Sequence, residues 1–437
     1  MAGLRGLLVD LTPLRRSRDF RLLWGSQVFT SLGRQVTVVA LPFQVYLVTH
    51  SSLAVGLIGL AQLLPLLATG LYAGAIADRV ERRLVQLAGK STAFLAAAAL
   101  AAGAGLHFGV WWFYLWAACG SAGATLDQTA RAATFPRLVS RGQYPAAAAM
   151  NQMLFQGAAV IGPSLAGLVI ASAGSAPAFA VEAVCVIPSA LLVLLVSRQS
   201  PAHDAARIGW RAPVDGVRFV LGRRLLVGIF AADLIAMILG LPLAVFPALA
   251  LSVFRLGPTG LGLLYAAPGA GAVVASLLSG WVSRIERQGT AVIVAIVIWG
   301  AAIAAFGVLG DVLPIGLLLL ALAGAADVFS AIFRNSILQL SIPDAMRGRM
   351  SAFNLIVVTG GPRLGDLEAG LAAYLVNPVF SVVSGGLGCV AGILLLAGLL
   401  PELRRQRAGV QDQATPSSST AKTSVALGGI GPTPRDP

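Results

Sequence analysis

The chain has 437 residues, of which 57% are hydrophobic and only 11% are charged, and its formal net charge is +13. An average soluble domain has about 25% charged residues, so this composition excludes a soluble globular protein and predicts an all-α membrane protein. The positive charge does not indicate nucleic-acid binding, because the arginines fall in short clusters between apolar runs and no base-stacking aromatic residues alternate with them.

Apolar runs long enough to cross a bilayer recur from Phe20 almost to Leu400. A hydrocarbon core about 30 Å thick needs about 20 apolar residues per helix. We therefore predict twelve transmembrane helices, at 20–48, 53–77, 84–106, 110–136, 148–173, 177–197, 225–251, 259–282, 290–310, 313–340, 350–376 and 379–400. The arginine clusters all fall on one side of this arrangement, and the opposite loops hold a single arginine, Arg255. The positive-inside rule then predicts that both termini are cytoplasmic.

Changes in composition divide the chain into five segments. Two six-helix bundles are predicted at 20–197 and 225–403, joined by a basic, partly amphipathic cytoplasmic linker at 198–224. Residues 1–19 form a basic cytoplasmic N-terminus, and residues 404–437, which are rich in Ser, Thr, Gly and Pro, are predicted to be a disordered cytoplasmic tail.

The two predicted bundles repeat each other at a constant offset of 203 residues. At this offset Pro65 matches Pro268, Arg131 matches Arg334 and Asn151 matches Asn354. Duplication of a six-helix unit is typical of secondary transporters, whose substrate site lies between the repeats near the membrane midplane.

Charged residues inside the predicted spans are the candidates for a transport site. Each costs about 2.5 to 3.5 kcal/mol at the centre of a span on insertion scales, so each should be paired or face a wet cavity. The set is Arg34, Asp127, Arg131, Glu182, Asp233, Asp327, Arg334, Arg363, Asp366 and Glu368.

Spacing relates some of these charges to one another. Asp127 and Arg131 are four residues apart and Arg363 and Asp366 are three apart, so each couple shares a helix face. For Asp127 and Arg131 we favour a structural ion pair near the cytoplasmic end over a role in coupling. Arg34 lies near the midplane, where a cavity role and a structural role stay open.

The remaining carboxylates differ in depth and in neighbours. Glu182 lies only a few residues inside the start of its predicted span, which favours an interfacial position. The role of Glu368 stays open. Asp233 and Asp327 have no opposite charge three or four residues away, and burial favours the neutral form of such a carboxyl unless another helix supplies a cation. They either couple transport to protons or pair with Arg34 or Arg334.

The loop after the second predicted span carries a dense group of charges. Its sequence GAIADRVERR contains Gly74, Asp78, Arg79, Arg82 and Arg83 at the spacing G-x-x-x-D-R-x-x-R-R, which resembles the loop motif of the major facilitator superfamily. The resemblance implies a fold of twelve helices in two bundles. It also implies that Asp78 latches the bundles together on the cytoplasmic side.

A second motif lies in the fifth predicted span. Gly157, Gly162, Pro163 and Gly167 resemble the antiporter motif of drug and proton exchangers, although Ala166 replaces one member of its final glycine pair. The strings RLGDLEAG at 363–370 and PELRR at 401–405 are similar to the bacterial branch that contains the enterobactin exporter and Tap-like multidrug efflux proteins. The resemblance therefore implies an exporter.

We predict a secondary active transporter in the bacterial inner membrane that exports amphipathic small molecules, drugs or a siderophore, in exchange for protons. Its expected partners are the substrate, protons and membrane lipids, and it is expected to be a monomer without a cofactor or a metal. Nucleotide hydrolysis is not supported, because the phosphate-loop pattern that would end at Gly89-Lys90-Ser91 has leucine, Leu84, at its first glycine position. The alternative is a non-transporting receptor or scaffold that has kept the fold.

Overall fold

The computed structural model describes residues 12–198, 211–343 and 346–406, with the backbone but not the side chains of residues 71–79 and of a few other helical positions. Within these ranges the regular secondary structure is entirely helical. The N-terminal bundle contains α1 (Thr12–Arg16), α2 (Arg18–Thr49), α3 (Ser52–Arg79), α4 (Arg82–Gly105), α5 (Val110–Leu138), η1 (Arg141–Gln143), α6 (Tyr144–Ala173) and α7 (Ser175–Leu194).

The C-terminal bundle has the same order of long helices, with more interruptions. It contains α9 (Arg224–Leu239), η2 (Leu243–Val245), α10 (Phe246–Ala248), η3 (Leu249–Val253), α11 (Gly257–Leu277), η4 (Ser279–Arg284), α12 (Gln288–Leu309), α13 (Leu313–Ser341), α14 (Arg347–Leu375), α15 (Pro378–Leu399) and α16 (Pro401–Arg405). The helix α8 (Arg211–Leu221) lies between the two bundles in the sequence and packs against α9 and α14 of the C-terminal bundle. Residues 1–11, 199–210 and 407–437 lie outside the described residues, and they belong to the predicted N-terminus (1–19), linker (198–224) and tail (404–437).

Apart from the span at 225–251, the predicted spans coincide with long helices. Nine helical segments of the described chain are long and apolar enough to cross a membrane. The long helices outside this set are α2, α5 and α14, which carry Arg34, Asp127 with Arg131, and Arg363 with Asp366, respectively. The chain is thus an all-helical membrane protein, and the full count of twelve spans stays a prediction.

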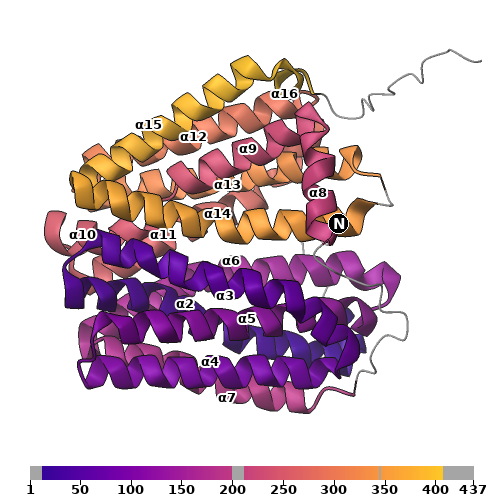
Figure 1. The fold of residues 1–437 in the computed structure, drawn as a ribbon, viewed down its shortest axis with the longest axis vertical. Coiled ribbons are helices and arrows are strands. Elements are labelled where there is room, and N and C mark those ends of the chain that lie inside the picture. Colours follow the sequence, from indigo (N-terminus) through magenta and orange to yellow (C-terminus); the bar gives the residue numbers. More distant parts are fainter. Residues whose placement is uncertain (1–11, 199–210, 344–345, 407–437) are drawn as a thin grey trace, which may run out of the picture.

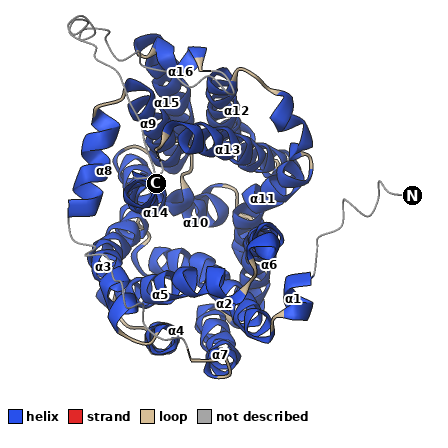
Figure 2. Cartoon of the chain, turned by 90° about the vertical axis from the view of Figure 1, so that its right-hand side faces the viewer, coloured by secondary structure: helices blue, strands red, loops and turns tan. Residues whose placement is uncertain are grey.

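The two bundles lie side by side, the first drawn in indigo to magenta and the second in pink to yellow (Figure 1). They meet along two seams, where α6 packs on α11 and α3 packs on α14. Viewed along the helices, these four helices and the fragment α10 surround the centre of the molecule (Figure 2).

Glycines bring the backbones close together at both seams. A Cβ atom added to Gly262 of α11 would lie 2.5 Å from the carbonyl oxygen of Pro163 on α6. On the other seam, a Cβ added to Gly59 of α3 would lie 2.5 Å from the carbonyl oxygen of Arg363 on α14. Small residues permit such close helix crossings inside a membrane.

The seams are closed at one end of the bundles. This is the end of the α2–α3 turn, where the carbonyl of Ser52 approaches Gly370 and the hydroxyl groups of Tyr46 and Ser252 are hydrogen bonded at 2.7 Å. Towards the other end of α6, a Cβ added to Gly157 would meet no atom within 4 Å. The closed end is the one that the arginine distribution predicts to be extracellular.

The predicted span 225–251 is not one continuous helix. The α-helix stops at Leu239, and the chain passes through Gly240 and Pro242 before the short turns that end at Val253. Trp299 Nε1 donates a hydrogen bond to the carbonyl oxygen of Gly240 at 2.7 Å, and the Tyr265 hydroxyl donates to that of Leu243 at 2.8 Å. A break at membrane depth is tolerated because these side chains satisfy the freed carbonyl groups.

Candidate functional site: a charged cavity in the N-terminal bundle

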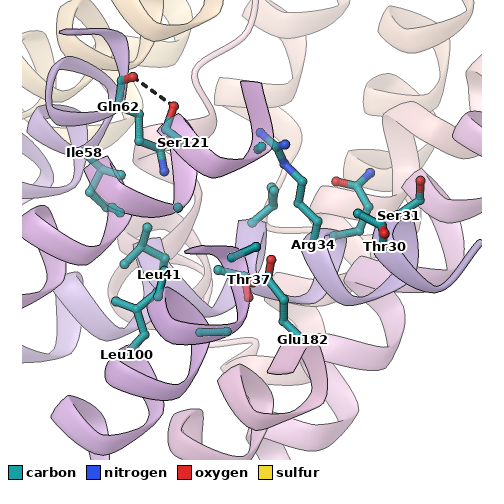
Figure 3. A pocket seen from close by; sticks show the side chains of 18 of the residues that line it. Thr30, Ser31, Arg34, Thr37, Leu41, Ile58, Gln62, Leu100, Ser121 and Glu182 are labelled. Atoms are coloured by element: carbon teal, nitrogen blue, oxygen red, sulfur yellow. Dashed lines mark hydrogen bonds between the residues drawn. The ribbon is translucent and has the colours of Figure 1, made fainter. Parts of the chain in front are cut away.

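A cavity of about 430 Å³ lies within the N-terminal bundle and reaches α11, α14 and η2 of the other bundle. Part of its wall is apolar, with Leu41, Ile58 and Leu100 (Figure 3). The cavity is also lined by seven charged side chains on five helices, Arg34, Lys90, Asp127, Arg131, Glu182, Arg363 and Asp366. This combination of apolar surface and a few polar groups is usual in small-molecule sites, which span about 300 to 1,000 Å³.

Several polar atoms around the cavity have no hydrogen-bond partner in the described part of the chain. These buried atoms are Gln27 Oε1, Gln62 Oε1, Trp116 Nε1 and Arg131 Nε. A buried polar group without a partner costs about 1 to 3 kcal/mol. These groups therefore indicate a cavity whose polar side is completed by water or by a ligand.

Lys90 and Asp127 form a buried ion pair between α4 and α5. Lys90 Nζ lies 3.3 Å from Asp127 Oδ1, and the two side chains are 3% and 8% exposed. Lys90 also donates a hydrogen bond of 2.9 Å to the hydroxyl of Thr30 on α2. The preferred prediction of an Asp127–Arg131 ion pair is therefore wrong, because a lysine on the neighbouring helix reaches the carboxylate instead.

Sequence reasoning overlooked Lys90 as a site residue. The comparison of Gly89-Lys90-Ser91 with a phosphate loop leaves out that Lys90 lies inside the predicted span 84–106. A lone cation in an apolar run is the same signal that identified Arg34. That signal was sufficient to place Lys90 among the charges that need a partner or a wet cavity.

Arg34 and Glu182 extend towards the cavity from α2 and α7 (Figure 3). Glu182 lies in the middle of α7, beside Thr37 of α2. The prediction of an interfacial carboxylate is therefore wrong. No ion pair in the described part of the chain involves Arg34, Arg131 or Glu182. Arg34 is exposed although it lies within the bundle, because its side chain lines the cavity.

The couple Arg363 and Asp366 lies on α14 where the cavity meets the α3–α14 seam. Arg363 Nη1 is 3.7 Å from Asp366 Oδ2, as their spacing along the helix predicts. Four cations and three carboxylates therefore line the cavity, a difference of one positive charge when all are ionised. Lys90 pairs with Asp127, and Arg363 pairs with Asp366. The remaining charged residues are two cations, Arg34 and Arg131, and one carboxylate, Glu182, so the extra positive charge belongs to this group.

A second group of charges lies in the C-terminal bundle. Arg334 of α13 forms an ion pair with Asp233 of α9 through its Nη1 atom, and its Nη2 atom lies 3.9 Å from Asp327 Oδ1. Of the two carboxylates, the Asp233 side chain is 8% exposed and the Asp327 side chain 44%. The structure therefore agrees with the alternative in which Arg334 is the cation that pairs with Asp233 and Asp327.

Asp327 also faces a smaller cavity, of about 170 Å³. This cavity is lined by residues of the C-terminal bundle, including Trp299, and by Gln156 of α6 from the N-terminal bundle. Asp327 therefore lies at the boundary between the bundles, whereas Asp233 is enclosed within one of them.

The loop motif between α3 and α4 is only partly visible. Arg82 is buried and donates a hydrogen bond of 3.4 Å to the carbonyl of Ala133, and Arg83 donates one of 3.2 Å to that of Val196. The side chains of Gly74, Asp78 and Arg79 lie outside the described residues. The latch role of Asp78 therefore stays a prediction.

The glycine motif of α6 faces two neighbours. A Cβ on Gly162 would collide with Gln35 of α2, while Pro163 and Gly167 contact α11 across the seam. Gly157 has open space beside it. The motif therefore contributes close packing around the cavity and at the closed end of the bundles.

Comparison with known proteins identifies the family. The model of the transmembrane secretion effector family, MFS_3, matches residues 9–427. The chain belongs to this family, within the major facilitator superfamily. Because members of the family are transporters, this transmembrane secretion effector is a secondary transporter and not an enzyme.

Individual relatives cover almost the whole chain. The enterobactin exporter EntS of Citrobacter koseri is 29% identical over 408 residues, which cover 92% of this chain and 96% of the relative. EntS of Escherichia coli SMS-3-5 is 28% identical over 426 residues, 95% of this chain and 99% of the relative. Among solved structures, a bacterial homologue of the iron transporter ferroportin in an inward-facing state superposes with a TM-score of 0.68 at 16% identity, covering 89% and 99% of the two chains. The last similarity shows the fold.

Proposed function

We propose that this transmembrane secretion effector exports small amphipathic molecules, such as a siderophore, across the bacterial plasma membrane in exchange for protons. The observation that carries the proposal is the cavity itself, which is lined by both charged and apolar side chains and lies between bundles whose two glycine seams are closed at one end. With both termini in the cytoplasm, this arrangement is the cytoplasm-facing state of an alternating-access cycle. The siderophore is suggested by the name of the enterobactin exporters that resemble the chain.

Coupling to protons is assigned to Asp327. Arg334 is a single cation beside two carboxylates, Asp233 and Asp327, and it forms the closer ion pair with Asp233. The second negative charge is costly inside a span unless a proton neutralises it. Asp327 is the carboxylate that is half exposed and that contacts a cavity shared with α6. Movement of one bundle against the other changes the surroundings of Asp327 and leaves those of Asp233 intact.

The proposal is tested with purified protein in liposomes under an imposed pH gradient. A catecholate siderophore and a panel of amphipathic dyes are offered, and we expect accumulation of at least one of them that a protonophore abolishes. Asp327→Asn should lose gradient-driven accumulation but keep exchange of labelled for unlabelled substrate, because exchange needs no net proton movement. Glu402→Gln, which changes an exposed carboxylate in an ion pair with Arg224, is the matched control and should behave as wild type.

Two outcomes would contradict this proposal in different ways. Absence of flux for every compound, with binding retained, would favour the receptor or scaffold that the sequence left as an alternative. Substrate flux that ignores the pH gradient in the wild-type protein would retain the exporter and remove the proton.

A further inference from the structure

The large cavity is lined by one more cation than carboxylate, and this extra positive charge favours an anionic substrate. We propose that Arg34 and Arg131 form an anion-binding subsite, which selects amphipathic molecules with one anionic group, a carboxylate or an ionised phenol, over cationic amphiphiles. The inference rests on the proposed export function and adds the charge of the molecule that is exported.

The first step of the argument is electrostatic. Lys90 and Arg363 each have a carboxylate within ion-pair distance, at 3.3 and 3.7 Å, so the two couples are balanced. Arg34 and Arg131 remain with Glu182 as the third member of the group, and no ion pair in the described ranges joins Glu182 to either arginine. An anionic group between the arginines neutralises the surplus, while a cationic ligand would double it. Charge repulsion inside a low-dielectric cavity is much stronger than in water.

The second step is hydrogen bonding. Arg131 Nε is buried and has no hydrogen-bond partner among the residues that the structure describes. A guanidinium presents its donors in a planar fork that matches a carboxylate or a pair of neighbouring oxygens. Gln27, Gln62 and Trp116 line the same cavity with unpartnered polar atoms, so a ligand with further polar groups finds additional partners.

The third step concerns the rest of the ligand. Leu41, Ile58 and Leu100 form an apolar wall of the same cavity (Figure 3). A ligand that places its anionic group at the arginines has apolar surface to bury against this wall. The subsite therefore fits an amphipathic anion rather than a small inorganic ion, which would leave the wall uncovered.

The test uses one coumarin fluorophore in three forms that carry a carboxylate, a neutral amide or a quaternary ammonium group. Binding is measured by equilibrium dialysis with purified protein, and transport in liposomes. The wild-type chain should prefer the carboxylate form. Arg34→Gln and Arg131→Gln should each weaken binding of that form by about tenfold or more, the effect of losing a hydrogen bond to a charged group.

Binding of the amide form should change less than twofold in the same variants, which separates a charge effect from damage to the cavity. Arg34→Lys should restore part of the preference, because it retains the charge without the fork. Arg218→Gln, on the exposed side of α8, is the matched control and should leave all three affinities unchanged. Retention of folding is checked by size-exclusion chromatography and thermal unfolding of every variant.

The subsite is refuted if the wild-type chain prefers the ammonium form, or if both arginine variants weaken the three forms equally. It stands, and the export function fails, if the carboxylate form binds in an arginine-dependent way but is never transported. Export without any dependence on Arg34 and Arg131 would retain the function and remove the subsite.

Discussion

The two bundles of this transporter repeat each other in sequence, yet the charged groups that contain their equivalent arginines have net charges of opposite sign. Arg131 and Arg334 occupy the same position of the repeat, and both lie on the inner side of their bundles. Around Arg131 the cavity has one cation too many, whereas around Arg334 there are two carboxylates for one cation. The repeat has kept the arginine and changed its partners.

Residues at matching positions show how the difference arose. At the offset of 203 residues, Asp233 corresponds to Thr30, Asp327 to Ala124, and Lys90 to Ile293. The N-terminal bundle thus has a lysine where the C-terminal bundle is apolar, and the C-terminal bundle has two carboxylates where the other has neutral residues. This separation suits a transporter in which one half binds an anionic substrate and the other half binds the coupling ion.

The largest predicted effect compares the two equivalent arginines directly. Arg334→Gln leaves Asp233 and Asp327 without their cation, and removing one partner of a buried ion pair costs about 3 to 5 kcal/mol. Arg131→Gln removes no ion pair within the described part of the chain and should cost less than about 1 kcal/mol. Thermal unfolding in detergent should therefore show a large loss for the first variant and a small one for the second. Equal losses would show that the charge difference between the bundles has no energetic consequence.

A smaller effect is expected for the buried pair of the N-terminal bundle. Lys90→Met or Asp127→Leu alone leaves one charge buried without its partner, whereas the double variant replaces both charges by apolar groups. Replacement of a whole buried pair is often neutral or even stabilising. We therefore expect the double variant to unfold at a higher temperature than either single variant, as a double-mutant cycle measures. Additive losses would mean that the two residues do not interact.

The sequence was sufficient for the helices and for most of the charges, but not for which charges meet. Apolar length and arginine clusters located the long helices because both follow from the cost of polar groups in lipid. Spacing along one helix correctly related Arg363 to Asp366. Spacing does not report neighbouring helices, so it predicts a pair of Asp127 with Arg131 although Asp127 pairs with Lys90 of α4.

Two other features depended on tertiary structure in the same way. The break after Leu239 persists because Trp299 and Tyr265 supply hydrogen bonds from other helices, although Gly240 and Pro242 are its local signal. The position of Glu182 near the start of its predicted span predicts an interfacial carboxylate, but the packing of α7 on α2 brings Glu182 to the cavity. Contacts between helices are therefore what the sequence leaves undetermined here.

The last prediction concerns the part of the repeat that stayed symmetric. Gly59 and Gly262 are equivalent at the offset of 203 residues, and each lies on a seam where an added Cβ would be 2.5 Å from a carbonyl oxygen of the other bundle. Gly59→Ala and Gly262→Ala should each destabilise the closed seam by about 1 to 3 kcal/mol through overpacking. Since about 1.4 kcal/mol is a factor of ten in an equilibrium, both variants should favour the state in which this end is open.

The opening is measured with a cysteine in place of Ser52, which is buried at the closed end, after serine has replaced Cys119, Cys185 and Cys389. A membrane-impermeant maleimide should label Ser52→Cys faster in both glycine variants. Gly157→Ala on α6 is the control, because its added Cβ meets no atom within 4 Å and should leave the labelling rate unchanged. Faster labelling in only one of the two glycine variants would show that the seams, like the charges, have diverged between the two halves.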